Sequence, residues 1–157
     1  MTITETGTRQ ATTGRSLVEP RLFERMSARI ATEHDMDSAT AGRIMDQALV
    51  FLGACAITTA PLSPSATVDI GWHTFILHTR EYAEFCDRIA GHFIHHIPTN
   101  GGNERADTAG TWETARAIVA AGYVVDAPMW EEAAKCTGCH NGCHDDPPPN
   151  PPEPEMN

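Results

Sequence analysis

Residues 69–98, DIGWHTFILHTREYAEFCDRIAGHFIHHIP, form the stretch of sequence that decides the fold. Its apolar positions recur in steps of three and four, as on one face of an α-helix: Trp72, Ile76, Thr79, Ala83, Cys86, Ala90 and Phe93. Gly91 can interrupt such a helix, and Pro98 ends it because proline lacks the backbone N–H that a helix interior needs. The pattern therefore predicts a long helix over this stretch.

The segments on either side carry the same periodicity. Upstream, ATAGRIMDQALVFLGACAITTA at residues 39–60 has so wide an apolar stripe that we expect the central, most buried helix there, capped by Asp37 or Ser38. A further helix is expected from Pro20 to about His34, and another in TWETARAIVAAG at residues 111–122, followed by a short acidic helix. No strand pair is convincing. The sequence predicts an all-α fold, a single compact domain of about four to five helices over residues 16–135.

The two ends of the chain differ from this body. Residues 1–15 are polar and rich in threonine, and they predict a disordered lead-in. Residues 136–146, CTGCHNGCHDD, hold three of the five cysteines and two of the eight histidines. Residues 147–157 include six prolines and predict an extended acidic tail without a core.

Charge and hydropathy narrow the class of protein. The formal net charge is −10, from 21 acidic and 11 basic residues, whereas nucleic-acid binders concentrate Lys and Arg on one face. No run approaches 18 apolar residues, and the polar opening lacks the apolar core of a secretory signal. We therefore expect no nucleic-acid partner, no membrane span and a cytoplasmic location, where thiols stay reduced.

The histidines of the first stretch suggest a metal site in the helical body. Asp69 and His73 are four residues apart and share one face of a helix, and His92 and His96 have the same spacing. Imidazole nitrogens and a carboxylate suit Zn²⁺ or Fe²⁺. The four residues Asp69, His73, His92 and His96 are one candidate metal site. The competing interpretation is that these histidines pack against aromatic residues or cap a helix end.

The same stretch resembles a known family. VDIGWHTFILHTREYAEFC…GHFIHH is similar to the motif of the glycine-rich domain-containing protein-like family, through Asp69, Trp72, His73, Tyr82, Cys86, Gly91 and either His95 or His96. The resemblance covers roughly residues 20–135 and lacks the long glycine-rich regions of plant members. It implies a helical domain of largely unassigned biochemistry, and no plant stress or RNA-related role is carried over.

The cysteine segment suggests a second metal site. Cys136-x2-Cys139 has the spacing of a two-thiolate zinc knuckle, and Cys139-x4-His144 extends it to C-x2-C-x4-H. The fourth ligand of that motif is missing, so Cys143, His140 or a histidine of the body would have to complete it. In a reducing compartment, this cluster predicts a closed structural Zn²⁺ site.

Other interpretations of the cysteine segment remain open. CTGCH satisfies the C-x-x-C-H pattern of covalent haem attachment, but that attachment takes place outside the cytoplasm and no export signal is visible, so haem is disfavoured. An iron–sulfur cluster would need a fourth ligand at a different spacing, and disulfides conflict with a reducing compartment.

Three hypotheses for function follow. The leading one is a zinc-binding helical protein without an assigned reaction. In the second, the helical body is a leader or carrier, and a partner enzyme modifies thiols of the cysteine tail. In the third, the His/Asp site of the body is the centre of a metal-dependent enzyme. No catalytic residue and no substrate can be named, because the sequence has no serine-nucleophile motif, phosphate loop or dinucleotide fingerprint.

Overall fold

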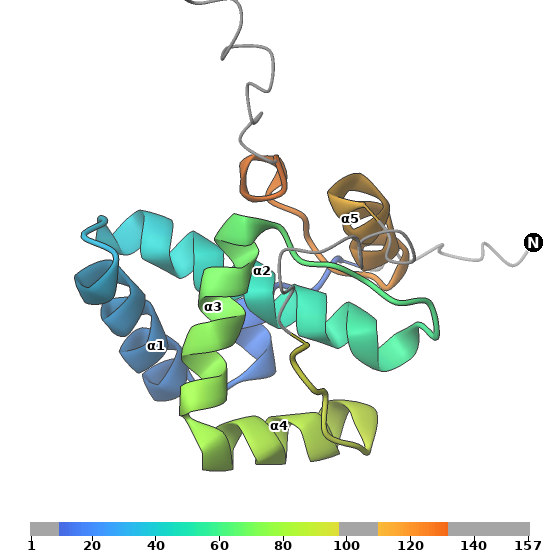
Figure 1. Ribbon diagram of the computed structural model, residues 1–157, viewed down its shortest axis with the longest axis horizontal. Helices are drawn as coiled ribbons and strands as arrows, with labels where there is room; N and C mark the ends of the chain where they lie inside the picture. Colours follow the sequence, from blue (N-terminus) through green and yellow to red (C-terminus); the bar gives the residue numbers. More distant parts are fainter. Residues whose placement is uncertain (1–9, 98–109, 132–157) are drawn as a thin grey trace, which may run out of the picture.

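The computed structural model describes residues 10–97 and 110–131. Within these ranges the chain forms five α-helices and two short 3₁₀ helices around one core (Figure 1). The elements are η1 (Gly14–Leu17), α1 (Pro20–Glu33), α2 (Ser38–Ile57), α3 (Ala66–Leu77), α4 (Thr79–Ala90), α5 (Thr111–Ala120) and η3 (Ala127–Met129). The all-α prediction is confirmed. The predicted cysteine segment, the prolines at 147–157 and residues 1–9 of the predicted lead-in lie outside the described residues.

Helix α2 is the centre of the fold. It runs across the middle of the molecule, and it contacts the other four α-helices (Figure 1). Eleven residues of α2 between Ala41 and Ala54 are buried, as the wide apolar stripe predicts. Asp37 is its N-cap and accepts a hydrogen bond from the backbone N–H of Thr40 at 2.9 Å. The prediction of a central helix capped at this position is confirmed.

Helix α2 also has the length and composition of a membrane span. An 18-residue window within Ser38–Ile57 has a mean hydropathy of 1.2, and 61% of that window is buried inside the fold. The helix is buried against α1, α3, α4 and α5, so it forms the core of this fold. The cytoplasmic location stays a prediction.

The stretch at residues 69–98 forms two helices rather than one. The chain breaks at His78, whose backbone N–H bonds to the Phe75 carbonyl three residues earlier and ends α3. Helix α4 then leaves in a clearly different direction (Figure 1). The buried positions Trp72, Phe75, Tyr82 and Cys86 keep helical spacing across the break, so periodicity alone could not reveal it. The prediction of one long helix was therefore wrong.

Two features fix α3 against the core. A Cβ atom at Gly71 would lie 2.6 Å from the Cβ of Ala48, so only glycine allows α3 to approach α2 this closely. Ser65 caps α3 by accepting from the Val68 N–H at 3.1 Å, and its hydroxyl donates to the Met129 carbonyl at 2.6 Å. The helix that carries Asp69 and His73 is thus held at its start and along one face.

The described C-terminal part is tied to α2 by polar contacts. The buried Gln47 amide accepts from the Asp126 N–H at 3.0 Å and from Trp130 Nε1 at 2.8 Å, and it donates to the Val124 carbonyl at 3.2 Å. An isolated parallel bridge pairs Thr12 with Tyr123, and no longer strand occurs in residues 10–97 and 110–131. Thr12 lies within the predicted lead-in and contacts the domain through this bridge.

Candidate metal centre

Asp69 and His73 lie one turn apart on α3 and face each other. Asp69 is in the first turn of the helix, where the helix dipole favours a negative charge. The Nε2 atom of His73 is 3.5 Å from one carboxylate oxygen of Asp69. The spacing of four residues that suggested this pair in the sequence thus produces the geometry expected of a continuous helix.

His96 reaches the same carboxylate from a separate segment. Helix α4 ends at Ala90, and Gly91 adopts a left-handed conformation (φ 72°, ψ 6°), which glycine accommodates without steric cost. The chain then reverses into residues 92–97, which form no helix or strand. Nε2 of His96 lies 2.8 Å from the other carboxylate oxygen of Asp69. The two imidazole rings are 4.4 Å apart between centroids.

The three residues offer one ligand atom each within 4.8 Å of one another. Ligand atoms about 2.0–2.1 Å from a tetrahedral zinc ion lie about 3.3 Å from each other. The two distances from the Asp69 carboxylate, 2.8 Å to His96 and 3.5 Å to His73, fall on either side of that value. Asp69, His73 and His96 are therefore spaced closely enough to hold a metal ion.

The three candidate ligands differ in their exposure to solvent. The side chain of His96 is 13% exposed and that of Asp69 is 29% exposed, whereas the side chain of His73 is 59% exposed. His96 is covered by the edge of the Trp72 ring, with 4.4 Å between ring centroids. His73 is therefore the most accessible of the three candidate ligands, and His96 is the least accessible.

Two buried aromatic residues anchor the segment that carries His96. Trp72 Nε1 donates a hydrogen bond to the Tyr82 hydroxyl at 2.8 Å, and this hydroxyl donates to the Ile94 carbonyl at 2.6 Å. Burial raises the pKa of Tyr82, so its hydroxyl stays protonated and able to donate. Trp72 and Tyr82, two residues of the sequence motif, thus hold in place the segment that carries His96. The spacing in the sequence gave no sign of this connection, because it passes through a backbone carbonyl.

The other predicted ligands are placed elsewhere. His92 lies beyond the end of α4, where its Nδ1 is 3.0 Å from the Ala90 carbonyl, and it does not join the cluster of Asp69, His73 and His96. The continuous helix that would have aligned His92 with His96 ends at Ala90. His95 packs on Phe93 with ring centroids 4.9 Å apart. Cys136, Cys139, His140, Cys143 and His144 lie outside the described residues.

The two cysteines of the body are not ligands of this cluster. Cys86 is fully buried in the core, and Cys55 is half-buried at its edge. Burial raises the pKa of the Cys55 thiol to about 12, so it is a neutral thiol at physiological pH. Their predicted place in the core agrees with these positions.

Comparison with known proteins adds a family to this geometry. A family model described as UCP032817-like matches residues 14–117. The chain belongs to the UCP032817-like family. No curated protein and no solved structure matches the chain. The part that matches the UCP032817-like family contains Asp69, His73 and His96 and ends before the cysteine segment.

This family corrects the resemblance drawn from the sequence. The chain is a UCP032817-like protein, and its assignment to the glycine-rich domain-containing protein-like family was wrong. The structure explains why the local pattern was weak ground for that assignment. Trp72, Tyr82 and Cys86 are buried where α3 and α4 meet, and aromatic and small residues at such spacing suit many helical cores. The description of the UCP032817-like family names no activity, so the function is argued from the site.

Proposed function

We propose that this protein binds a divalent transition-metal ion, Zn²⁺ or Fe²⁺, through Asp69, His73 and His96. The observation that carries the proposal is the convergence of three ligand atoms within 4.8 Å. Helical spacing alone explains the pairing of Asp69 with His73. It does not explain His96, which comes from a separate segment and turns its Nε2 atom to the same carboxylate.

The types of ligand atom select the class of ion. Two imidazole nitrogens and one carboxylate suit Zn²⁺ and Fe²⁺, whereas Ca²⁺ and Mg²⁺ prefer oxygen ligands. Without an ion, the contact of 2.8 Å between His96 and Asp69 requires a proton on Nε2 of His96. An ion would bind Nε2 only after that nitrogen has given up its proton, which the neutral ring then carries on Nδ1. Because imidazole must be neutral to bind a metal ion, we expect ion binding to weaken at low pH.

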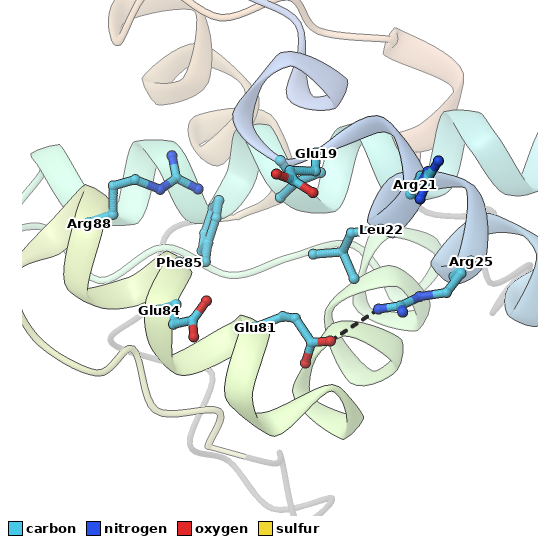
Figure 2. Close-up of a pocket in the computed structure, with 9 residues that line it drawn as sticks. Glu19, Arg21, Leu22, Arg25, Glu81, Glu84, Phe85 and Arg88 are labelled. Carbon is cyan, nitrogen blue, oxygen red and sulfur yellow. Dashed lines mark hydrogen bonds and ion pairs between the residues drawn. The ribbon is translucent and has the colours of Figure 1, made fainter.

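The site supports binding more directly than catalysis. Three protein ligands leave at least one coordination position open, and the exposure of His73 leaves it accessible to solvent. A groove of about 480 Å³ lies between α1 and α4, and residues such as Leu22, Arg25 and Phe85 line it (Figure 2). None of the three candidate ligands lines this groove. We therefore propose a bound ion and assign no reaction.

The proposal is tested by elemental analysis of the full-length protein and of ligand variants. In a background in which Cys136, Cys139 and Cys143 are replaced by serine, we expect one zinc or iron ion per chain. His96→Ala should lower the affinity for the ion by at least about a hundredfold, because even residues that only support a metal ligand contribute about 10–100-fold.

His95→Ala is the matched control, because His95 is the neighbouring histidine and lies outside the cluster. It should keep the ion. A serine background that holds no transition metal at equilibrium with micromolar zinc would rule out the proposal. An ion that survives both His73→Ala and His96→Ala would place the binding site elsewhere.

The cysteine segment supports a separate proposal, from its spacing alone. We propose that Cys136, Cys139 and His144, with Cys143 or His140 as fourth ligand, bind a structural Zn²⁺. The wild-type chain would then hold one more zinc than the serine background. Equal metal content in the two proteins would exclude this second site. If the tail is instead the substrate of a modifying enzyme, the intact mass of the protein from its own cell would show a shift confined to residues 136–157.

A further inference from the structure

Residues 92–97, which we call the strap, make two polar contacts with the body. Near the middle, the Ile94 carbonyl accepts the hydrogen bond from Tyr82 at 2.6 Å. Near the end, Nε2 of His96 contacts Asp69 at 2.8 Å. The strap has no helix or strand of its own, and Phe93 and Ile97 are 44% and 81% exposed. Its position therefore depends on these two contacts, on the ring packing beside them and on the Ile94 side chain, which packs against the core.

The two contacts are connected through one buried side chain. Trp72 donates from Nε1 to the Tyr82 hydroxyl, and the edge of its ring system covers His96. Tyr82 is fully buried, and its ring packs edge-on against Phe93 of the strap, with centroids 5.2 Å apart. Loss of the Tyr82 hydroxyl would free the Ile94 carbonyl and leave the indole N–H of Trp72 without this acceptor. The hydroxyl thus supports His96 without touching it.

We infer that Tyr82 is a positioning residue for the metal centre and that ion binding is coupled to docking of the strap on α3. This inference rests on the proposed metal site. An ion bound by Asp69, His73 and His96 would join α3 to the strap, so it would bind the docked state more tightly than the undocked one. Linkage requires the reverse as well: whatever holds the strap down raises the affinity for the ion.

Tyr82→Phe tests the coupling, because it removes the hydroxyl and keeps the ring in the core. In the full chain with serine at 136, 139 and 143, we expect zinc affinity to fall about tenfold, as for other residues that orient a metal ligand. Tyr123→Phe is the matched control, since the ring of Tyr123 lies against Gly53 on α2. It should bind zinc with unchanged affinity.

Chymotrypsin cleavage after Phe93 measures strap docking independently of affinity. Cleavage in the native protein follows the population of the open strap. Zinc should slow this cleavage in the chain with serine at 136, 139 and 143, and Tyr82→Phe in the same background should speed it in the absence of metal. Asp69→Asn keeps an oxygen that can accept from His96 but weakens the metal ligand, so zinc should not slow cleavage there.

The outcomes separate this inference from the proposed function. If the chain with serine at 136, 139 and 143 binds no zinc, both fall. If that chain binds zinc and its Tyr82→Phe variant binds it equally well, only the positioning role falls. If zinc binds without slowing cleavage after Phe93, the coupling is wrong. A fall in affinity for Tyr123→Phe equal to that for Tyr82→Phe would show a general loss of stability and overturn the assignment of Tyr82.

Discussion

Asp37 shows how one side chain sets the start of the central helix. Its carboxylate accepts from the Thr40 backbone N–H at 2.9 Å and from the Thr40 hydroxyl at 2.7 Å. These hydrogen bonds, the side-chain one first, lower the pKa of Asp37 below its ordinary value. The charged form of the cap is therefore the one that stabilises α2.

This cap gives a prediction for the pH dependence of stability. Because the folded-state pKa lies below the unfolded value of about 3.9, the charged cap stabilises the fold above about pH 4. The contribution is lost as the pH falls through the lower, folded-state pKa. Asp37→Asn keeps an acceptor but has no charge to titrate. In thermal unfolding at pH 6, the wild type should have a higher Tm than Asp37→Asn. The difference in Tm should shrink toward pH 2.5. A constant difference across that range would contradict the prediction.

At the scale of single residues, the sequence identified one pair of the candidate metal centre, Asp69 and His73. The pairing of Asp69 with His73 follows from helical spacing, which operates within one element and can be recognised from sequence. The contact of His96 with Asp69 depends on a reversal at Gly91 and on an anchor at the Ile94 carbonyl. A backbone carbonyl carries no residue-specific signal, so the sequence could not distinguish His96 from His92 as the partner.

The packing of α3 on α2 depends on Gly71. A Cβ atom there would meet the Ala48 side chain at 2.6 Å and the Ile44 carbonyl oxygen at 3.0 Å. The two helices would have to separate to accept it. Because α3 carries Asp69 and His73, any such shift would also move the metal centre relative to the core.

Gly71→Ala should therefore lower the free energy of unfolding by about 1–3 kcal/mol, the usual cost of overpacking a core. Gly42→Ala is the matched control on α2, since no atom lies within 4 Å of the added methyl group. It should raise stability by about 0.5–1 kcal/mol, because alanine favours helix more than glycine does. Urea unfolding measures both. Equal stabilities for the two variants would refute the close approach.

The helices differ in how well their sequence predicts them. Helix α2 has a wide stripe, an N-cap and a clear start, and its position follows from these signals. The boundary between α3 and α4 has neither glycine nor proline, and it lies at His78. The turn there is set by how Phe75, Tyr82 and Phe85 pack together, with ring centroids of 5.1–5.2 Å. These three residues lie within eleven positions of the sequence, but their spacing suits one continuous helix equally well, so periodicity does not reveal the turn.

At the scale of the whole molecule, Gln47 connects the core to residues more than 70 positions away. Its amide is 1% exposed and pairs with Val124, Asp126 and Trp130. Arg43 makes a second tie to the same segment, with 2.6 and 2.9 Å to the Asp126 carboxylate, but its side chain is 47% exposed. Because Gln47 is buried, its hydrogen bonds should contribute more to stability than the ion pair between Arg43 and Asp126.

Gln47→Met should lower the free energy of unfolding by about 2–4 kcal/mol, since it leaves the buried Trp130 indole N–H and the part-buried Asp126 N–H without their acceptor. Arg43→Met should cause a smaller loss, because the Asp126 side chain is 25% exposed and water can solvate its carboxylate when the partner is lost. Urea unfolding, with Trp fluorescence as the signal, compares the two. A larger loss for Arg43→Met would show that the exposed ion pair holds the segment.

The position of His96 beyond the reversal at Gly91 also sets when all three residues of the candidate metal centre are present during synthesis. Asp69 and His73 are made first, and His96 follows 23 residues after His73. At about 5–20 residues per second, this is a delay of roughly one to five seconds on the ribosome. Until then the nascent chain presents only two of the three ligands. We expect the ion to be acquired after α4 has folded back, so metal loading would follow the folding of α1 to α4 rather than assist the first helices.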